Sequence, residues 1–209
     1  MLARLAALAA TLLVAGCSML GDRSGTEEPT FDAVATIGAL EIRRYGPRLA
    51  AETVIQADEE AARNQGFRRL AGYIFGGNSG KAEIAMTAPV SQRAGSKIAM
   101  TAPVSQGRDA AGDWVVRFFL PRQWTMATLP QPNGPSVRLV TVPGETVAVL
   151  RFSGDRGPGA VAARQAELLS ALENSSWRAQ GMSYGWFYDP PWTLPWLRRN
   201  EVVVPVVGR

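Results

Sequence analysis

The sequence contains no histidine, and this absence removes several classes of catalytic site at once. Without an imidazole there is no Ser-His-Asp or Cys-His nucleophile system, no histidine-ligated zinc and no proton transfer by histidine. A single cysteine, Cys17, also excludes a disulfide within the chain. Binding is therefore favoured over catalysis, and we expect a protein that is not an enzyme.

Signatures of phosphate and nucleic-acid binding are missing as well. Residues 76–81 resemble a phosphate loop, but Phe75 replaces its first glycine and Ala82 replaces the Ser or Thr that would hold magnesium. The 22 basic side chains only slightly outnumber the 18 acidic ones. They occur as scattered pairs and not as a stripe interleaved with aromatic residues, so we expect no nucleic-acid partner.

The one long apolar run, residues 5–15, follows Arg4 and is too short to span a bilayer as a mature helix. It ends in the letters LVAGC, which resemble a bacterial lipobox. This resemblance implies a signal peptide over residues 1–16 and lipidation of Cys17; an ordinary signal peptide with a chance cysteine is the alternative. Acyl chains on Cys17 would anchor the protein in the cell envelope, facing the periplasm, without a spanning helix. Ser18 favours the outer over the inner membrane.

The rest of the chain divides into a short segment and one domain. Residues 17–30 are polar and aperiodic, which indicates a lipidated flexible tether, and residues 31–209 have the length of a single domain. Within that domain the expected elements occur twice in the same order. They are strands at 39–45 and 49–56, a helix at 58–74, strands at 84–90 and 114–120, then strands at 137–142 and 146–153, a helix at 158–173, and strands at 182–188 and 202–207. The order predicts an α+β fold of two β-β-α-β-β halves, with two helices packed on antiparallel sheet.

The segment IAMTAPVSQ occurs twice, at residues 84–92 and 98–106. Each copy is apolar and rich in β-branched residues, but Pro89 and Pro103 exclude it from the middle of a regular sheet. We therefore expect a hairpin or a bulged edge at the margin of the sheet, lengthened by the second copy.

Four residues of the first expected helix recur at i, i+4, i+7 and i+11 and share one face: Arg63, Phe67, Leu70 and Ile74. Two interpretations fit this face. In one, the helix packs on its sheet and Arg63 extends toward water. In the other, the apolar residues form a ligand groove with one cation at its rim, suited to a flat hydrophobic molecule that carries a carboxylate.

A second anomaly is the aromatic loop at residues 185–201, where three of the six tryptophans fall among three prolines. Prolines exclude a helix or an interior strand there. The loop is expected either to fold back on the core or to cover a ligand, since an exposed patch of this kind is rare on a soluble monomer.

Several motifs occur in one order along the chain: YIFGGN (73–78), IAMTAPV (84–90), FSG (152–154), YDPPW (188–192) and RRNEV (198–202). Together they resemble the SOUL haem-binding protein family over residues 31–207. The resemblance implies a distorted antiparallel β-barrel of two pseudo-symmetric halves. It also implies that haem or another tetrapyrrole binds in a shallow apolar groove along the first helix, under the loop that carries Trp192 and Trp196.

By this resemblance, Arg63 matches an arginine that meets a propionate, and Phe67 and Leu70 match apolar groove positions, with Ile74 at the end of the same face. A lysine found in the late loop of some relatives is missing, and Arg198 is its candidate replacement.

An axial histidine is impossible in this chain. Haem iron would be ligated by Met86, Met100 or a tyrosine, or would have no protein ligand. Binding of the porphyrin would therefore rest on apolar contact and stacking.

The sequence thus predicts a lipid-anchored envelope protein that binds haem or another porphyrin without histidine ligation, as a carrier or scavenger. Two alternatives stay open. One is a binding module for other amphiphilic molecules, which an acidic groove would favour. The other is an enzyme that acts on a tetrapyrrole.

Overall fold

The computed structural model describes residue 21 and residues 23–94 and 113–209. The predicted signal peptide, Cys17, Met100 and the second copy of IAMTAPVSQ lie outside the described residues. Within these ranges, no helix combines the length and the apolar character that crossing a bilayer requires.

Within the described residues, the domain contains ten strands and two α-helices. In the first half they are β1 (Phe31–Ile37), β2 (Leu40–Tyr45), β3 (Arg48–Gln56), α2 (Glu59–Ile74), β4 (Val90–Ala94) and β5 (Asp113–Phe119). In the second half they are β6 (Arg138–Val142), β7 (Glu145–Phe152), α3 (Pro158–Glu173), β8 (Trp177–Ala179), β9 (Tyr184–Phe187), the short 3-10 helix η1 (Pro195–Leu197) and β10 (Asn200–Gly208).

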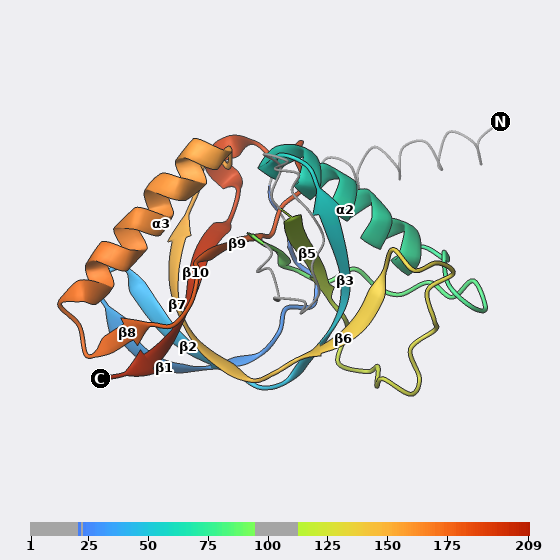
Figure 1. Cartoon of the computed structure of the whole chain (residues 1–209), viewed down its shortest axis with the longest axis horizontal. Helices are drawn as coiled ribbons and strands as arrows, with labels where there is room; N and C mark the ends of the chain where they lie inside the picture. Colours follow the sequence, from blue (N-terminus) through green and yellow to red (C-terminus); the bar gives the residue numbers. More distant parts are fainter. Residues whose placement is uncertain (1–20, 22, 95–112) are drawn as a thin grey trace, which may run out of the picture.

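One antiparallel sheet curls through the whole domain in the order β1-β2-β7-β10-β9-β4-β5-β3-β6, with β8 added on β10 (Figure 1). The pairing is symmetric about the β4–β9 pair. The pair β3–β5 has its counterpart in β7–β10, and β4–β5 has its counterpart in β9–β10. The predicted α+β fold of two pseudo-symmetric β-β-α-β-β halves is confirmed.

The two halves are joined by a long two-stranded ribbon. β2 pairs with β7 and β3 pairs with β6, so each of the two β-β units pairs across the halves and not with itself. The ribbon bends where Gly46 and Pro47 separate β2 from β3, and where Pro143 and Gly144 separate β6 from β7. The ribbon continues through this bend from one half into the other, and the sheet curls into a distorted barrel (Figure 1).

Both helices begin at local signals that the sequence carries. Asp58 caps α2 by accepting a hydrogen bond from the Ala61 N–H at 2.8 Å, and Glu59 and Glu60 place negative charge in the first turn. Pro158 occupies the first turn of α3, where its missing N–H costs no helical hydrogen bond. The predicted helices at 58–74 and 158–173 therefore agree closely with the structure.

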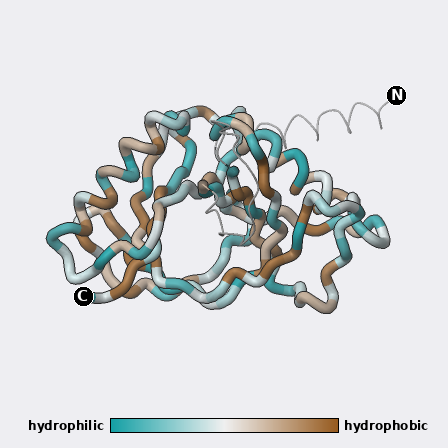
Figure 2. Tube along the Cα trace, in the orientation of Figure 1, coloured by the Kyte–Doolittle hydropathy of each residue, from teal (hydrophilic) through white to brown (hydrophobic). Residues whose placement is uncertain are grey.

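Hydrophobic side chains form three clusters, two under the helices and one inside the barrel. α3 covers the face of β7 and β10, and α2 covers the face of β3 and β5. Hydrophobic and hydrophilic residues alternate along both helices in Figure 2, as helices with one buried face require. The third cluster, around Trp186, lies on the opposite face of the sheet.

Three local expectations differ from the structure. β1 and β8 were not expected, since neither has a clear alternating pattern. β4 lies between β9 and β5, so the prediction that the first IAMTAPVSQ copy forms a sheet margin is wrong. Pro89 lies just before β4, and Val90–Ala94 can therefore pair with a strand on each side. The predicted tether also ends early, because Arg23 and Glu28 form ion pairs with the domain.

Candidate functional site

The apolar face of α2 is closed against the sheet. Leu70 is fully buried and Ile74 is 1% exposed, both in the cluster that α2 shares with β3 and β5. Phe67 is partly buried and packs edge-on against Phe118, with ring centroids 5.3 Å apart. Leu70 and Ile74 thus offer a ligand no surface, as the packed-helix interpretation expected, but Arg63 is only 9% exposed and does not extend toward water as that interpretation also expected.

Arg63 lies beside two other arginines where the N-terminal ends of α2 and α3 converge. Arg63, Arg156 and Arg198, here called the arginine cluster, line one hollow of about 280 Å³ together with Glu60 and Asp155. The guanidinium of Arg63 also sits over the Phe187 ring, 4.8 Å from its centroid. The structure therefore brings together the two predicted arginines, Arg63 and Arg198, and adds Arg156.

Backbone carbonyls hold the arginine cluster in place. Arg63 donates to the Arg156 carbonyl at 2.9 Å, Arg156 donates to the Asp189 carbonyl at 2.8 Å, and Arg198 donates to the Thr193 carbonyl at 2.7 Å. Within the part of the chain that the structure describes, none of these arginines forms an ion pair with a carboxylate. Burial, with the charges of Arg63 and Arg198, lowers the pKa of Arg156 to about 10. The cluster can accept an anion.

The predicted tryptophans lie on the loop next to this cluster and point outward. Trp192 is 58% and Trp196 is 68% exposed, so neither is a lid on the core. Met86, a predicted axial ligand, is partly exposed and is not among the residues that line the large cavity described next. The binding roles of these residues stay predictions.

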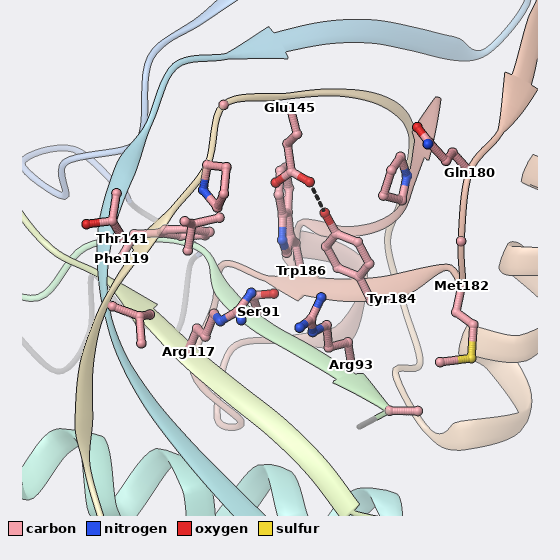
Figure 3. A pocket seen from close by; sticks show the side chains of 17 residues that line it. Ser91, Arg93, Arg117, Phe119, Thr141, Glu145, Gln180, Met182, Tyr184 and Trp186 are labelled. Atoms are coloured by element: carbon pink, nitrogen blue, oxygen red, sulfur yellow. Dashed lines mark hydrogen bonds between the residues drawn. The ribbon is translucent and has the colours of Figure 1, made fainter. Parts of the chain in front are cut away.

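A hollow of about 600 Å³, partly open to solvent and here called the interior cavity, lies on the barrel side of the sheet (Figure 3). Its walls come from both halves. They are Ser91, Arg93 and Ala94 of β4, Arg117 and Phe119 of β5, residues 140–145 of the β6–β7 turn, residues 180–182 before β9, Tyr184 and Trp186 of β9, and Pro205 of β10.

Aromatic rings form one side of the interior cavity. Trp186 meets Phe119 and Tyr184 edge-on, at centroid distances of 6.2 and 6.0 Å. Behind them the guanidinium of Arg48 lies 4.6 Å from the Phe119 centroid, and its Nε and Nη1 atoms are buried without a hydrogen-bond partner. Trp186 is 1%, Phe119 4% and Tyr184 8% exposed, so the rings form a closely packed floor of the cavity, and Tyr184 offers a planar ligand the most ring surface of the three.

Among the described residues that line the cavity, the charged side chains are Arg93, Arg117 and Glu145. Glu145 forms an ion pair with Arg48 and accepts a hydrogen bond from the Tyr184 hydroxyl at 3.4 Å. Burial, reinforced by the charge of Glu145, raises the pKa of Tyr184. Arg117 pairs with Glu52 at 2.5 Å. Among the described residues Arg93 forms no ion pair, and Figure 3 shows its side chain directed into the cavity. The excess charge is therefore positive.

These features fit a porphyrin. The volume lies within the roughly 300–1,000 Å³ usual for pockets that hold drug-sized molecules, and the lining combines aromatic rings, which meet edge-on, with a cation, Arg93, that can meet a carboxylate. Met182 at the rim, 59% exposed, carries a thioether that can face iron. The sequence did not predict Arg93, Met182 or Tyr184 as site residues, because the cavity depends on strand pairing between the halves. The one available signal was strand alternation, which places Tyr184 and Trp186 on one face of the strand.

Solved structures share this architecture. The C-terminal domain of EcmrR matches with a TM-score of 0.59 at 10% identity, over 86% of this chain and 99% of that domain. A hydrolase from Listeria innocua matches with a TM-score of 0.57 at 12% identity, over 83% of this chain and 94% of that one. At such identities the likeness concerns the fold, and it defines the chain as a member of this class of two-half α+β barrels.

The family follows from the sequence matches. The model of the SOUL heme-binding protein family matches residues 26–205, and the chain belongs to that family. It is 27% identical to heme-binding protein 1 of Bos taurus, over 75% of this chain and 77% of the bovine protein. It is 37% identical to heme-binding protein 2 of Mus musculus over 82 residues, which cover 34% of this chain and 40% of the mouse protein.

Proposed function

We propose that this protein binds haem or a related tetrapyrrole in the interior cavity, as a lipid-anchored carrier or scavenger in the cell envelope. The observation that carries the proposal is a cavity of about 600 Å³ with aromatic walls and an unpaired arginine, in a chain of the SOUL family. The ring would lie against Tyr184 and the exposed Met182, over the floor that Phe119 and Trp186 form, and Arg93 would meet a carboxylate. A bound porphyrin supplies no chemistry that the proposal needs, since the protein only holds and releases it.

The charge of the cavity separates this proposal from binding of amphiphilic cations. A cation would need a free carboxylate, but Glu145 is already neutralised by Arg48. The additional positive charge of Arg93 repels a cation and attracts an acid. An anionic planar ligand is therefore the better fit.

Lipid anchoring is part of the same proposal and rests on the LVAGC segment that ends at Cys17. An acylated cysteine would place the domain at the periplasmic face of a membrane, with the outer membrane favoured by Ser18. An enzymatic alternative would have to convert the porphyrin, and prolonged incubation with hemin should leave the porphyrin chemically unchanged.

Titration of the chain that begins at Ser18, which keeps every described residue, tests ligand binding. Hemin and protoporphyrin are added while the Soret band is recorded, and we expect a saturable shift with both. Val140 lines the cavity and packs against the cluster around Trp186 on the barrel side of β6, so Val140→Trp should fill part of the cavity and weaken binding by about tenfold or more.

Thr36→Trp is the control, because Thr36 is an exposed strand threonine on β1 and does not line the cavity. It should bind like wild type. Arg63→Ala and Trp192→Ala test the predicted groove along α2. Loss of binding in these two variants, with Val140→Trp unaffected, would move the site to that helix. The absence of a saturable shift with either ring would reject tetrapyrrole binding altogether.

A further inference from the structure

The loop between β9 and β10 exposes large apolar side chains at one end of the molecule. Trp192 and Trp196 are more than half exposed, and Leu197, in η1, is 36% exposed. The Gly154 N–H donates to the Pro195 carbonyl at 2.8 Å, which holds the loop beside the start of α3. In Figure 1 both helices begin at this end. Such a patch usually meets another surface.

The N-terminal segment is fixed to the same loop. Arg23 donates to both carboxylate oxygens of Asp189, at 2.7 and 2.9 Å, two residues before Pro191. A Cβ atom on Gly21 would lie 2.9 Å from the Leu197 carbonyl oxygen, so the backbone of Gly21 runs directly against η1. Chain leaving the domain toward its N-terminus therefore starts at the exposed tryptophans.

The length of the remaining chain limits where the anchor can be. Gly21 comes four positions after Cys17 in the sequence. Four residues span at most about 14 Å when fully extended. A lipid on Cys17 would therefore hold the bilayer surface close to Leu197 and the neighbouring tryptophans.

The charge next to the patch also suits a membrane. Arg198 donates to the Pro191 and Thr193 carbonyls, which places the arginine cluster directly beside Trp192. In their hollow the three arginines face Glu60 and Asp155, and Glu59 also lies near Arg63, but among the described residues none of the three forms an ion pair, so their guanidinium groups can meet an external anion. Tryptophan prefers the headgroup region of a bilayer, and arginine near it is attracted to anionic lipid.

We propose that Trp192, Trp196, Leu197 and the arginine cluster form a docking surface for an anionic phospholipid bilayer. The location of the anchor rests on the proposed acylation of Cys17, whereas the contact itself is made by the described residues. An anchor alone would leave the domain free to rotate about one point. The docking surface adds a second contact and sets one orientation of the domain on the membrane.

The first test uses the full-length lipidated protein in vesicles of phosphatidylethanolamine and phosphatidylglycerol with brominated acyl chains. Bromine quenches the fluorescence of tryptophans that lie close to it. We expect quenching in the wild type, and the double variant Trp192→Ser/Trp196→Ser should lose most of it. Equal quenching in the two proteins would overturn the proposal.

The second test needs no lipid anchor. The chain that begins at Ser18 is sedimented with the same vesicles, and the double variant should bind at least about tenfold less. Phe75→Ser is the control, because Phe75 is 63% exposed at the opposite end of α2 and should leave binding unchanged. Failure of the wild-type chain to bind would overturn the lipid surface and indicate a protein partner. Equal binding to phosphatidylcholine vesicles would overturn the role of the arginines.

These results can be separated from those that test the anchor and the cavity. The mass of the mature protein reports acylation of Cys17, and hemin titration reports the cavity. An unmodified Cys17 together with vesicle binding by the Ser18 chain would reject the anchor and keep the docking surface. Acylation of Cys17 without any effect of the tryptophan variants would keep the anchor and reject the docking surface.

Discussion

Glu201 is a carboxylate with no solvent exposure, and its neighbours explain how a charge can remain there. Arg43 donates to it at 2.9 and 3.2 Å, and Arg199 donates at 2.9 and 3.0 Å. The Tyr188 hydroxyl donates a further hydrogen bond at 2.7 Å. Two cations and a hydroxyl thus surround one buried anion that joins β10 to β2.

Replacing Glu201 with alanine should be strongly destabilising. The change leaves Arg43, 3% exposed, without its buried partner, and breaking a buried pair in this way costs about 3–5 kcal/mol of unfolding free energy. Urea unfolding measures the effect. Glu167→Ala, which removes only an exposed pair with Arg164, should stay within about 0.5 kcal/mol of wild type. Similar losses for the two variants would show that the buried network adds nothing.

At the residue scale, the sequence predicted which charged residues lie together better than it predicted what each of them contacts. Arg63 and Arg198 were expected to share a site, and the structure places them in one cluster with Arg156. The role of Glu201 could not be predicted, because Arg43 lies on β2, 158 positions away in the sequence. Arg199 is only two positions from Glu201, but the sequence does not show that the two side chains meet. No local pattern signals such a contact.

At the scale of elements, α2 approaches the sheet most closely at Gly66. A Cβ atom there would lie 2.6 Å from Cγ2 of Val116 on β5, closer than real atoms approach. The glycine therefore sets the distance between helix and strand, although glycine within a helix costs about 0.5–1 kcal/mol relative to alanine. Close packing of α2 outweighs that cost.

Two glycine variants on the same helix separate these effects. Gly66→Ala should destabilise the protein by about 1–3 kcal/mol, since Val116 or the helix must shift. Gly72→Ala meets nothing within 4 Å and should stabilise it by up to about 1 kcal/mol. Thermal or urea unfolding of both variants measures the difference. A stabilising Gly66→Ala would mean that the helix can move away from β5 without cost.

Elements with strong local signals were predicted well. Asp58 and Pro158 mark the starts of α2 and α3, and the predicted bounds nearly coincide with the observed ones. β4 was placed wrongly because the proline rule was applied to a whole segment, whereas Pro89 precedes the strand that pairs. The face of α2 fitted two interpretations, and only the position of β5 decides between them.

At the scale of the whole molecule, all four tyrosines are held neutral. Burial raises the pKa of Tyr45, Tyr73, Tyr184 and Tyr188 above the ordinary value. The unfolded chain would ionise near about pH 10. Because the pKa of these tyrosines is higher in the folded protein than in the unfolded chain, their contribution to stability is complete below about pH 10 and is lost as the pH rises above that value.

The protein should therefore become less stable in alkali. We expect a constant urea midpoint between about pH 7 and 9 and a falling midpoint above about pH 10, with tyrosinate absorbance appearing only as the protein unfolds. Tyrosinate that forms near pH 10 while the far-ultraviolet circular dichroism stays native would contradict the burial of these hydroxyls.

The cavity belongs to this scale too, which is why the sequence did not reveal it. Arg93 and Tyr184 lie on β4 and β9, strands from different halves that pair along the axis of pseudo-symmetry. Repetition of the β-β-α-β-β order predicted that two halves exist. It did not predict which face of the joined sheet would be left hollow.

The exchange of strands between β2–β7 and β3–β6 has a consequence for how the chain can be divided. A fragment cut after β5 would keep its helix and the β1–β2 pair, yet the edges at which β2 pairs with β7, β3 with β6 and β4 with β9 would have no neighbour. Such a fragment could complete its backbone hydrogen bonds only by pairing these strand edges with those of a second copy of the fragment. Neither half is a module in its own right, and reassembly of two separately made pieces should depend on their concentration.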